Sequence, residues 1–390
     1  MAVSAIPSAA ITPGDALALT SALVAVDSRN PSLVPGGPGE GDAALLLADV
    51  LSRWGFSVAV HEAGPGRPNV VARVGRGGGR SLMFNGHLDV VGIEGMQHAP
   101  FDPVIRDGRL YGRGSCDMKA GVAAMCAAAW RAARDGLRRE VIVAAVCDEE
   151  FDSLGTRALV AAGARADAAV VTEPTRLAIN PAHRGFVWHE LAFRGRAAHG
   201  SRYDLGIDAI RHAGLVIAEL DRLERDELPQ RTHPLLGRGS LHLSRISGGE
   251  GWSTYPAQCT LGLERRTLPG DSVATVRREL DAAFSAVRAR EPQLDVAVTG
   301  VAEQAPSDVP VDAPIVRALS EALGAAGRPA TIEGMSAWTD CALLNAAGVP
   351  AVCFGPGDIT LAHAAEEYVP VHDIAVATDV LARLATAWTA

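Results

Sequence analysis

The sequence predicts an α/β fold with a mostly parallel central sheet flanked by helices and with an inserted α+β domain. The chain has 390 residues, which is too long for one compact hydrophobic core. Between residues 183 and 302, strand-like segments alternate apolar with polar residues, as half-buried antiparallel strands do. Elsewhere, four nearly continuous apolar segments lie among helical patterns, which is typical of buried parallel strands. These segments are residues 82–84, 141–147, 168–172 and 349–354.

The elements before the inserted segment follow from hydrophobic periodicity. Apolar residues three and four apart predict helices, and short apolar runs predict strands. The helices are at 14–28, 42–54 and 120–134, and the first two strands are at 57–61 and 69–74. The glycine run at 75–79 predicts a solvated turn without a binding function, because no helix follows it to cradle a phosphate.

The inserted segment has the order of a ferredoxin-like βαββαβ unit. It predicts a strand at 186–195, a helix at 207–225, strands at 240–247 and 260–266, a helix at 273–290 and a strand at 294–299. A helix at 313–326, followed by a last strand and helix, then returns to the first pattern. We therefore expect a discontinuous larger domain, residues 1–182 and 303–390, with residues 183–302 inserted into it.

Composition narrows the class of partner. The formal net charge is −9 and the pI is near 5.7, so no global basic field attracts nucleic acid or an anionic membrane. Small-molecule or protein partners are expected instead. The six cysteines show no CxxC pair and no framework spacing, which predicts reduced thiols. Because there is no signal-peptide pattern and no apolar run of transmembrane length, we expect a cytoplasmic protein.

Residue types that bind metals follow each of the four buried segments. They are His87 and Asp89 after the first, Asp148, Glu149 and Glu150 after the second, Glu173 after the third and His363 beyond the fourth. Asp117 adds a further carboxylate at the glycine-bounded start of the helix at 120–134. Because ligands gather at the carboxyl ends of parallel strands, these side chains are expected to converge.

Two histidines and three carboxylates can hold a pair of Zn²⁺ ions if one carboxylate bridges them, and Asp117 is our candidate for the bridge. Asp89 can accept the His87 ring N–H that does not face a metal. Glu149, next to the candidate ligand Glu150, is the expected general base. Asp148 is left as a solvated or capping residue.

Five blocks in this order, GHLDVV, GRGSCDMKAG, DEEFDSLGT, TEPT and AHAAEEY, resemble the dinuclear zinc M20 peptidase and deacylase family. The resemblance implies a zinc-peptidase-like catalytic domain with an inserted lid and dimerisation domain, and two Zn²⁺ ions per subunit. It further implies that His87, Asp117 and Glu173 bind one zinc. The other zinc would be bound by Asp117, Glu150 and His363. Glu149 would be the catalytic base. Asp89 would match the family's carboxylate that hydrogen-bonds to a metal-binding histidine without binding the metal itself.

Within the inserted segment, the resemblance implies roles for three residues. His199 would reach the active site of a neighbouring subunit in a homodimer and polarise the scissile carbonyl. Arg266 could grip a substrate carboxylate through two hydrogen bonds. Ser253 stands where many relatives have an asparagine that holds that carboxylate. The serine could replace the asparagine with a shorter reach, or the substrate could carry a different head group. Trp252 and Trp338 could line a substrate pocket or pack in a core.

The motifs after residue 335 are closer to those of acetylornithine deacetylase-type members, which favours removal of an acyl group, first of all acetyl, from an N-acyl amino acid. A dipeptidase or carboxypeptidase of the same family would use the same metal chemistry. A serine or cysteine hydrolase is disfavoured, because no GxSxG motif is present. A metal-dependent binding protein on an inactive scaffold would lack a ligand or the base, yet every position is filled. Co²⁺ or Mn²⁺ could replace zinc at such ligands.

Overall fold

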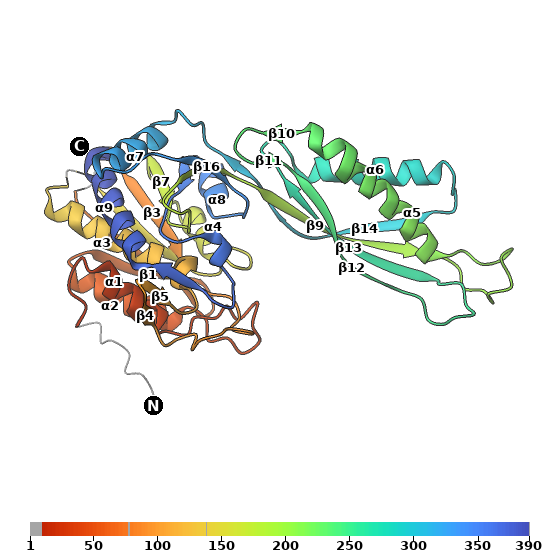
Figure 1. Cartoon of the computed structure of the whole chain (residues 1–390), viewed down its shortest axis with the longest axis horizontal. Coiled ribbons are helices and arrows are strands. Elements are labelled where there is room, and N and C mark those ends of the chain that lie inside the picture. Colours follow the sequence, from red (N-terminus) through yellow and green to blue (C-terminus); the bar gives the residue numbers. More distant parts are fainter. Residues whose placement is uncertain (1–9, 77–78, 138, 390) are drawn as a thin grey trace. The chain divides into compact units, whose positions relative to one another are not determined.

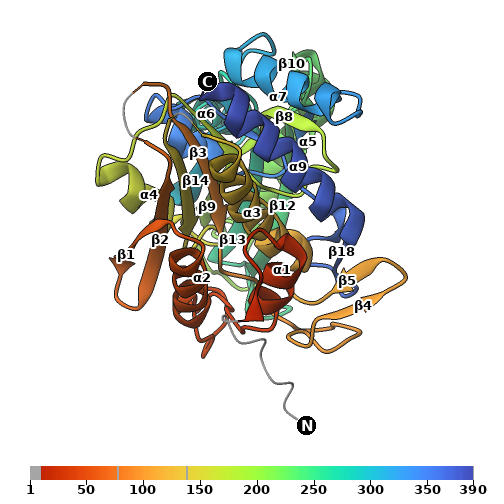
Figure 2. The same cartoon turned by 90° about the vertical axis from the view of Figure 1, so that its left-hand side faces the viewer.

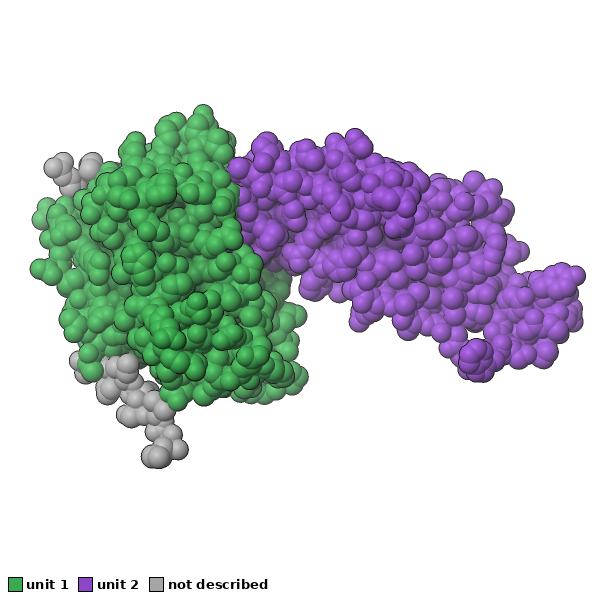
Figure 3. Space-filling model, in the orientation of Figure 1, with its two compact units in different colours: residues 1–181, 309–333, 339–390 green, residues 182–308, 334–338 purple. Residues whose placement is uncertain are grey.

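The computed structural model describes residues 10–76, 79–137 and 139–389, and it divides into two compact units (Figure 3). Unit 1 comprises Met1–Pro181, Val309–Glu333 and Thr339–Ala390, and unit 2 comprises Ala182–Asp308 and Gly334–Trp338. We propose that unit 2 corresponds to the inserted domain predicted at 183–302. Part of the glycine run predicted as a turn, residues 77–78, lies outside the described residues.

The central sheet of unit 1 has the strand order β1-β2-β6-β3-β7-β17-β8. Its strands are β1 Ser57–Gly64, β2 Arg67–Val74, β3 Leu82–His87, β6 Val141–Val146, β7 Ala168–Val171, β17 Ala351–Cys353 and β8 Ile179–His183. The four middle strands, β6, β3, β7 and β17, are parallel, whereas β1, β2 and β8 pair antiparallel with their neighbours. The prediction of a mostly parallel central sheet formed by the four apolar segments is confirmed.

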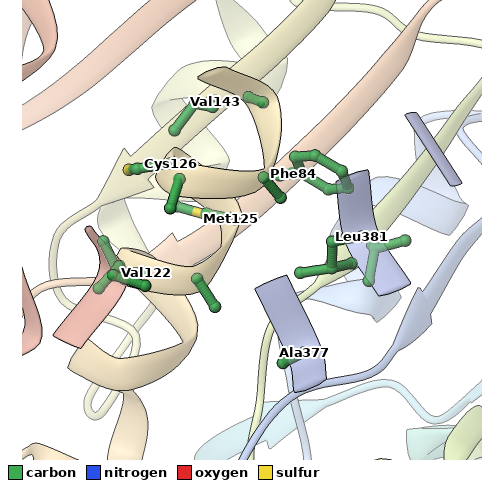
Figure 4. Close-up of a cluster of buried hydrophobic side chains, with 14 of the residues drawn as sticks. Phe84, Val122, Met125, Cys126, Val143, Ala377 and Leu381 are labelled. Atoms are coloured by element: carbon green, nitrogen blue, oxygen red, sulfur yellow. The ribbon is translucent and has the colours of Figure 1, made fainter. Parts of the chain in front are cut away.

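Helices cover this sheet (Figures 1 and 2). They are α1 Ala16–Val24, α2 Gly41–Arg53, α3 Ala120–Arg134, α4 Leu154–Ala161, α7 Pro314–Ala325, α8 Cys341–Ala346 and α9 Val371–Trp388. Figure 4 shows α3 and α9 meeting over the sheet, where Met125 and Leu381 lie near Phe84 of β3. Alternate residues of β3 and β6 belong to this core, as expected for strands whose side chains point to opposite faces.

Several further elements are short. A separate three-stranded sheet has the order β18-β5-β4, with strands β4 Val104–Arg106, β5 Arg109–Tyr111 and β18 Tyr368–Pro370. The other short elements are the π-helical turn η2 Ser115–Lys119, the 3-10 turn η5 Ile359–Leu361 and the strands β15 Ser307–Asp308 and β16 Ile332–Met335. No helix in the described ranges is long and apolar enough to cross a membrane.

Unit 2 contains a four-stranded antiparallel sheet of order β12-β13-β9-β14 and two helices that pack on it. Its elements are β9 Gly185–Arg194, α5 Ala209–Arg222, β12 Ser240–Gly248, β13 Gln258–Thr267, α6 Val273–Arg288 and β14 Asp295–Gln304. Short turns η3 Leu223–Glu227 and η4 Leu228–Gln230 and a small hairpin, β10 Thr232–His233 with β11 Gly237–Arg238, join α5 to β12. The element order is that of the predicted βαββαβ unit.

Candidate metal centre

The metal-type side chains meet at the carboxyl ends of the parallel strands in unit 1. His87 is the last residue of β3, Glu149 and Glu150 follow β6, and Glu173 follows β7. His363 lies in the loop after η5, and Asp117 lies within η2, directly before α3. Because parallel strands end at one edge of a sheet, residues far apart in the chain converge there.

His87, Asp117 and Glu173 form one candidate ligand group, in which one donor atom of each residue lies within 4.8 Å of the others. His87 Nε2 is 3.1 Å from Asp117 Oδ1 and 3.9 Å from Glu173 Oε1. Donor atoms around a tetrahedral Zn²⁺ at about 2.0–2.2 Å are roughly 3.3–3.6 Å apart. The group therefore fits one such ion with small movements.

Asp117, Glu150 and His363 form the second candidate group. His363 Nε2 is 2.9 Å from Glu150 Oε2 and 3.5 Å from Asp117 Oδ2. Asp117 thus turns one carboxylate oxygen toward His87 and the other toward His363. A carboxylate with its two oxygens directed in this way can bridge a pair of cations.

The electrostatics of the cluster also favour cations. Burial raises the pKa of Glu149 and of Glu173 well above their ordinary values, and neighbouring carboxylates add to the effect. A hydrogen bond with Glu150 raises the pKa of His363 to about 9, because the charged imidazole offsets part of the negative charge. Crowded acids of this kind are stabilised by divalent cations, and imidazole with carboxylate is a ligand set that suits zinc and several other divalent ions.

Asp89 has a different set of contacts from the one predicted. His87 Nδ1 lies 3.0 Å from the main-chain carbonyl of Asp89, while the nearer carboxylate oxygen is 3.6 Å away. The carboxylate instead accepts hydrogen bonds from the backbone N–H groups of Glu149 and Glu150, both at 3.2 Å, and from Asn30 Nδ2 at 2.8 Å. Asp89 therefore links His87 to the loop that carries Glu149.

Of the two interpretations of Asp148, a solvated residue is wrong, because the side chain is buried. A capping residue agrees with the structure, because the first N–H of α4, at Leu154, donates to its carboxylate at 3.4 Å. The carboxylate also accepts from Arg67 at 2.9 Å and from Asn30 at 3.0 Å. Arg67 in turn binds both oxygens of buried Glu40 at 2.6 and 2.7 Å. A buried carboxylate requires such partners, and sequence reasoning missed them because they come from separate elements.

Three residues named from the sequence lie in unit 2. His199 and Ser253 are exposed and occupy paired loops, since Gly200 N–H donates to Ser253 O at 2.8 Å and His199 bridges to Thr254. Arg266 lies on β13 opposite Phe186, at the start of β9, whereas His199 follows the end of β9. The structure thus does not bring Arg266 together with the other two within the unit.

The two tryptophans named from the sequence, Trp252 and Trp338, have different surroundings. Trp252 is fully exposed, so it does not pack in a core. Trp338 donates from Nε1 to the carbonyl of Ala305 at 3.0 Å and meets the ring of His183 edge-on.

Comparison with known proteins adds two kinds of similarity. A model of peptidase family M20/M25/M40 matches residues 83–387. Acetylornithine deacetylase of Myxococcus xanthus is 34% identical over 344 residues, which cover 85% of this chain and 88% of that protein. The family match, at residues 83–387, spans all five blocks that carry the metal-type residues.

Among solved structures, aminopeptidase PepT from Bacillus cereus ATCC 10987 superposes with a TM-score of 0.80 at 19% identity, covering 97% of this chain and 100% of that one. The YXEP protein of Bacillus subtilis, described as a dinuclear metal-binding peptidase of the M20 family, has a TM-score of 0.74 at 16% identity, covering 95% and 97%. At such identities these two matches establish the fold.

Proposed function

The chain belongs to peptidase family M20/M25/M40 and is a hydrolase of that family, and from this premise we propose that it removes an acyl group, first of all acetyl, from an N-acyl amino acid. The reaction adds water across the amide bond and yields a carboxylate and a free amine. The choice of an N-acetyl substrate is supported by the similarity to an acetylornithine deacetylase at 34% identity.

We assign two divalent cations to the cluster, with zinc as first candidate and cobalt or manganese as substitutes. His87 and Glu173 would hold one ion, and Glu150 and His363 would hold the other. Asp117 would bind both ions. When bound, such ions would polarise the scissile carbonyl and lower the pKa of a water molecule that they bind. The proposal is supported by the orientation of the two Asp117 oxygens toward different histidines.

Glu149 is assigned as the general base. Its Oε2 lies 4.0 Å from His87 Nε2 of the first candidate group, and Glu149 precedes Glu150 of the second group in the chain but belongs to neither group. A carboxylate there can take a proton from the attacking water and deliver it to the departing amine. Burial raises its pKa well above the ordinary value, and a base works best when its pKa lies near the working pH.

For the residues of unit 2, we propose that the protein is a homodimer in which His199 of one subunit stabilises the developing oxyanion in the other. Arg266 would bind the substrate carboxylate, with Ser253 in place of the family's asparagine. The exposure of His199 and Ser253 and their shared position on paired loops support this role.

The observation that carries the proposed function is the pair of ligand groups joined at Asp117 with Glu149 beside them. Its test is a panel of N-acetyl amino acids, N-succinyl amino acids and dipeptides, incubated with protein loaded with Zn²⁺, Co²⁺ or Mn²⁺. Free amine is measured after each incubation.

We expect the highest kcat/KM on an N-acetyl amino acid. Preference for dipeptides would replace the deacylase proposal by a peptidase. If the protein binds two ions but hydrolyses neither N-acyl amino acids nor dipeptides, the alternative of a metal-dependent binding protein remains.

A further inference from the structure

The structure assigns a positioning role to Glu367, a residue that the sequence did not single out and that touches no reacting atom. We propose that its carboxylate clamps the segment carrying Asp117, so that Asp117 is held in place to serve both candidate metal positions. The inference rests on the proposed dinuclear centre and goes beyond it, because it names what orients the shared ligand.

The clamp consists of four hydrogen bonds to one fully buried carboxylate. Oε2 accepts from Arg113 Nη1 at 2.7 Å and from the backbone N–H of Gly114 at 3.0 Å. Oε1 accepts from the backbone N–H groups of Cys116 at 2.9 Å and of Asp117 at 3.1 Å. The loop from Arg113 to Asp117 therefore wraps around Glu367, and the last donor belongs to the shared ligand itself.

The strand ladder sets this arrangement. Tyr368 of β18 pairs with Tyr111 of β5, so Glu367, one residue before β18, comes to lie opposite the chain leaving β5. The N–H of Gly112 also approaches the carbonyl of Glu367 at 3.4 Å. His363 precedes Glu367 by four residues, so one short segment carries a candidate ligand and the clamp for another.

The chemistry requires a carboxylate at this position. All four partners are donors, and a carboxylate offers only acceptor sites. Glutamine has the same shape, but its NH₂ group would face donors on one side. The buried Arg113 guanidinium would then also lose its ionic partner.

The experiment compares Glu367→Gln with wild type by metal titration. Apo-protein is titrated with Zn²⁺ against a chromophoric chelator, bound metal is counted by elemental analysis, and thermal unfolding of the apo-protein is recorded separately. Leu47→Ala, a core truncation in α2 at a residue that belongs to neither the clamp nor a ligand group, serves as the destabilised control. Arg113→Lys removes the guanidinium and leaves the carboxylate.

We expect Glu367→Gln to bind the weaker of two zinc equivalents about 10- to 100-fold less tightly, as loss of a partner behind a ligand commonly does. Arg113→Lys should show a smaller loss in the same direction, and Leu47→Ala should bind both ions normally despite a lower melting temperature. If Glu367→Gln does not fold, Arg113→Lys decides the question by the same titration.

The proposal is overturned if the clamp variants bind two ions as wild type does, if Leu47→Ala loses metal equally, or if wild type binds fewer than two. Failure of the clamp is separable from failure of the proposed function, because the titration uses no turnover. Wild type that binds two ions but hydrolyses no N-acyl amino acid would remove the proposed substrate and leave the clamp standing.

Discussion

Glu149 is the residue on which the proposed chemistry depends most directly. We expect Glu149→Gln to retain two bound ions, because the side chain belongs to neither ligand group, and to lose about 10²- to 10⁴-fold in kcat, the usual contribution of a general base. Asp152→Asn, which changes an exposed acid in the same loop, is the matched control. Steady-state kinetics with metal analysis would refute the assignment if Glu149→Gln kept near-wild-type kcat.

His87 and Asp89 should respond differently to truncation, although they are two residues apart. His87→Ala removes a ligand and should empty one of the two metal positions. Asp89→Ala removes the acceptor of two backbone N–H groups, so metal affinity should fall about 10- to 100-fold without loss of either position. Metal counts at saturating zinc distinguish the two cases, and equal stoichiometries would contradict this division.

At the scale of elements, the close approach of α3 to the end of β7 depends on one glycine. A Cβ atom on Gly121 would lie 1.9 Å from the backbone oxygen of Thr172, next to Glu173. We expect Gly121→Ala to lower the free energy of unfolding by about 1–3 kcal/mol, as overpacking does, and to weaken metal binding. Urea titration measures this loss of stability. The control is Gly41→Ala at the first position of α2, where an added Cβ meets open space, and this variant should be neutral or slightly stabilising.

His183, at the end of β8, gives a pH dependence that does not involve the metal cluster. Burial lowers its pKa to about 4, whereas an unfolded histidine binds a proton below about pH 6.5. The unfolded state therefore binds more protons between these values, and stability should fall as pH drops through this window, by up to about 3 kcal/mol.

The measurement for His183 is the urea midpoint at pH 7 and pH 5. His183→Phe should show a smaller drop between the two pH values than wild type does. An identical drop in both proteins would mean that other groups carry the acid sensitivity.

Regular elements could be predicted where their pattern is local. The buried strands and α3 are continuous or periodic in apolar residues over their whole length, so the local sequence pattern located them. The strands β5 and β18 were missed because each has three residues, and they form only through pairing across a long stretch of chain. The helices α4 and α8, at 8 and 6 residues, are too short to show a clear period.

At the scale of the whole molecule, the proposed homodimer makes a prediction about mixed subunits. If His199 acts in the neighbouring active site, His199→Ala and Glu149→Gln are each inactive alone, but a mixed dimer contains one site with both groups intact. Random exchange of subunits should then restore roughly a quarter of wild-type turnover.

Co-refolding of the two variants, followed by an activity assay and measurement of molar mass, tests this prediction. No recovery in a confirmed dimer would place His199 outside the partner's site. The cytoplasmic location also remains a prediction, which fractionation of cells can check.

By itself, the sequence determined the fold class, the family and the residue types gathered at the strand ends, because these follow from local patterns and from five ordered blocks. Only the tertiary structure decided how Asp117 divides its oxygens, what the Asp89 carboxylate holds and that Asp148 is buried. It also disclosed Glu367, whose ion-pair partner Arg113 is 254 residues away in the chain. Hydrogen bonds over such separations depend on the folded path of the backbone, which no local pattern records.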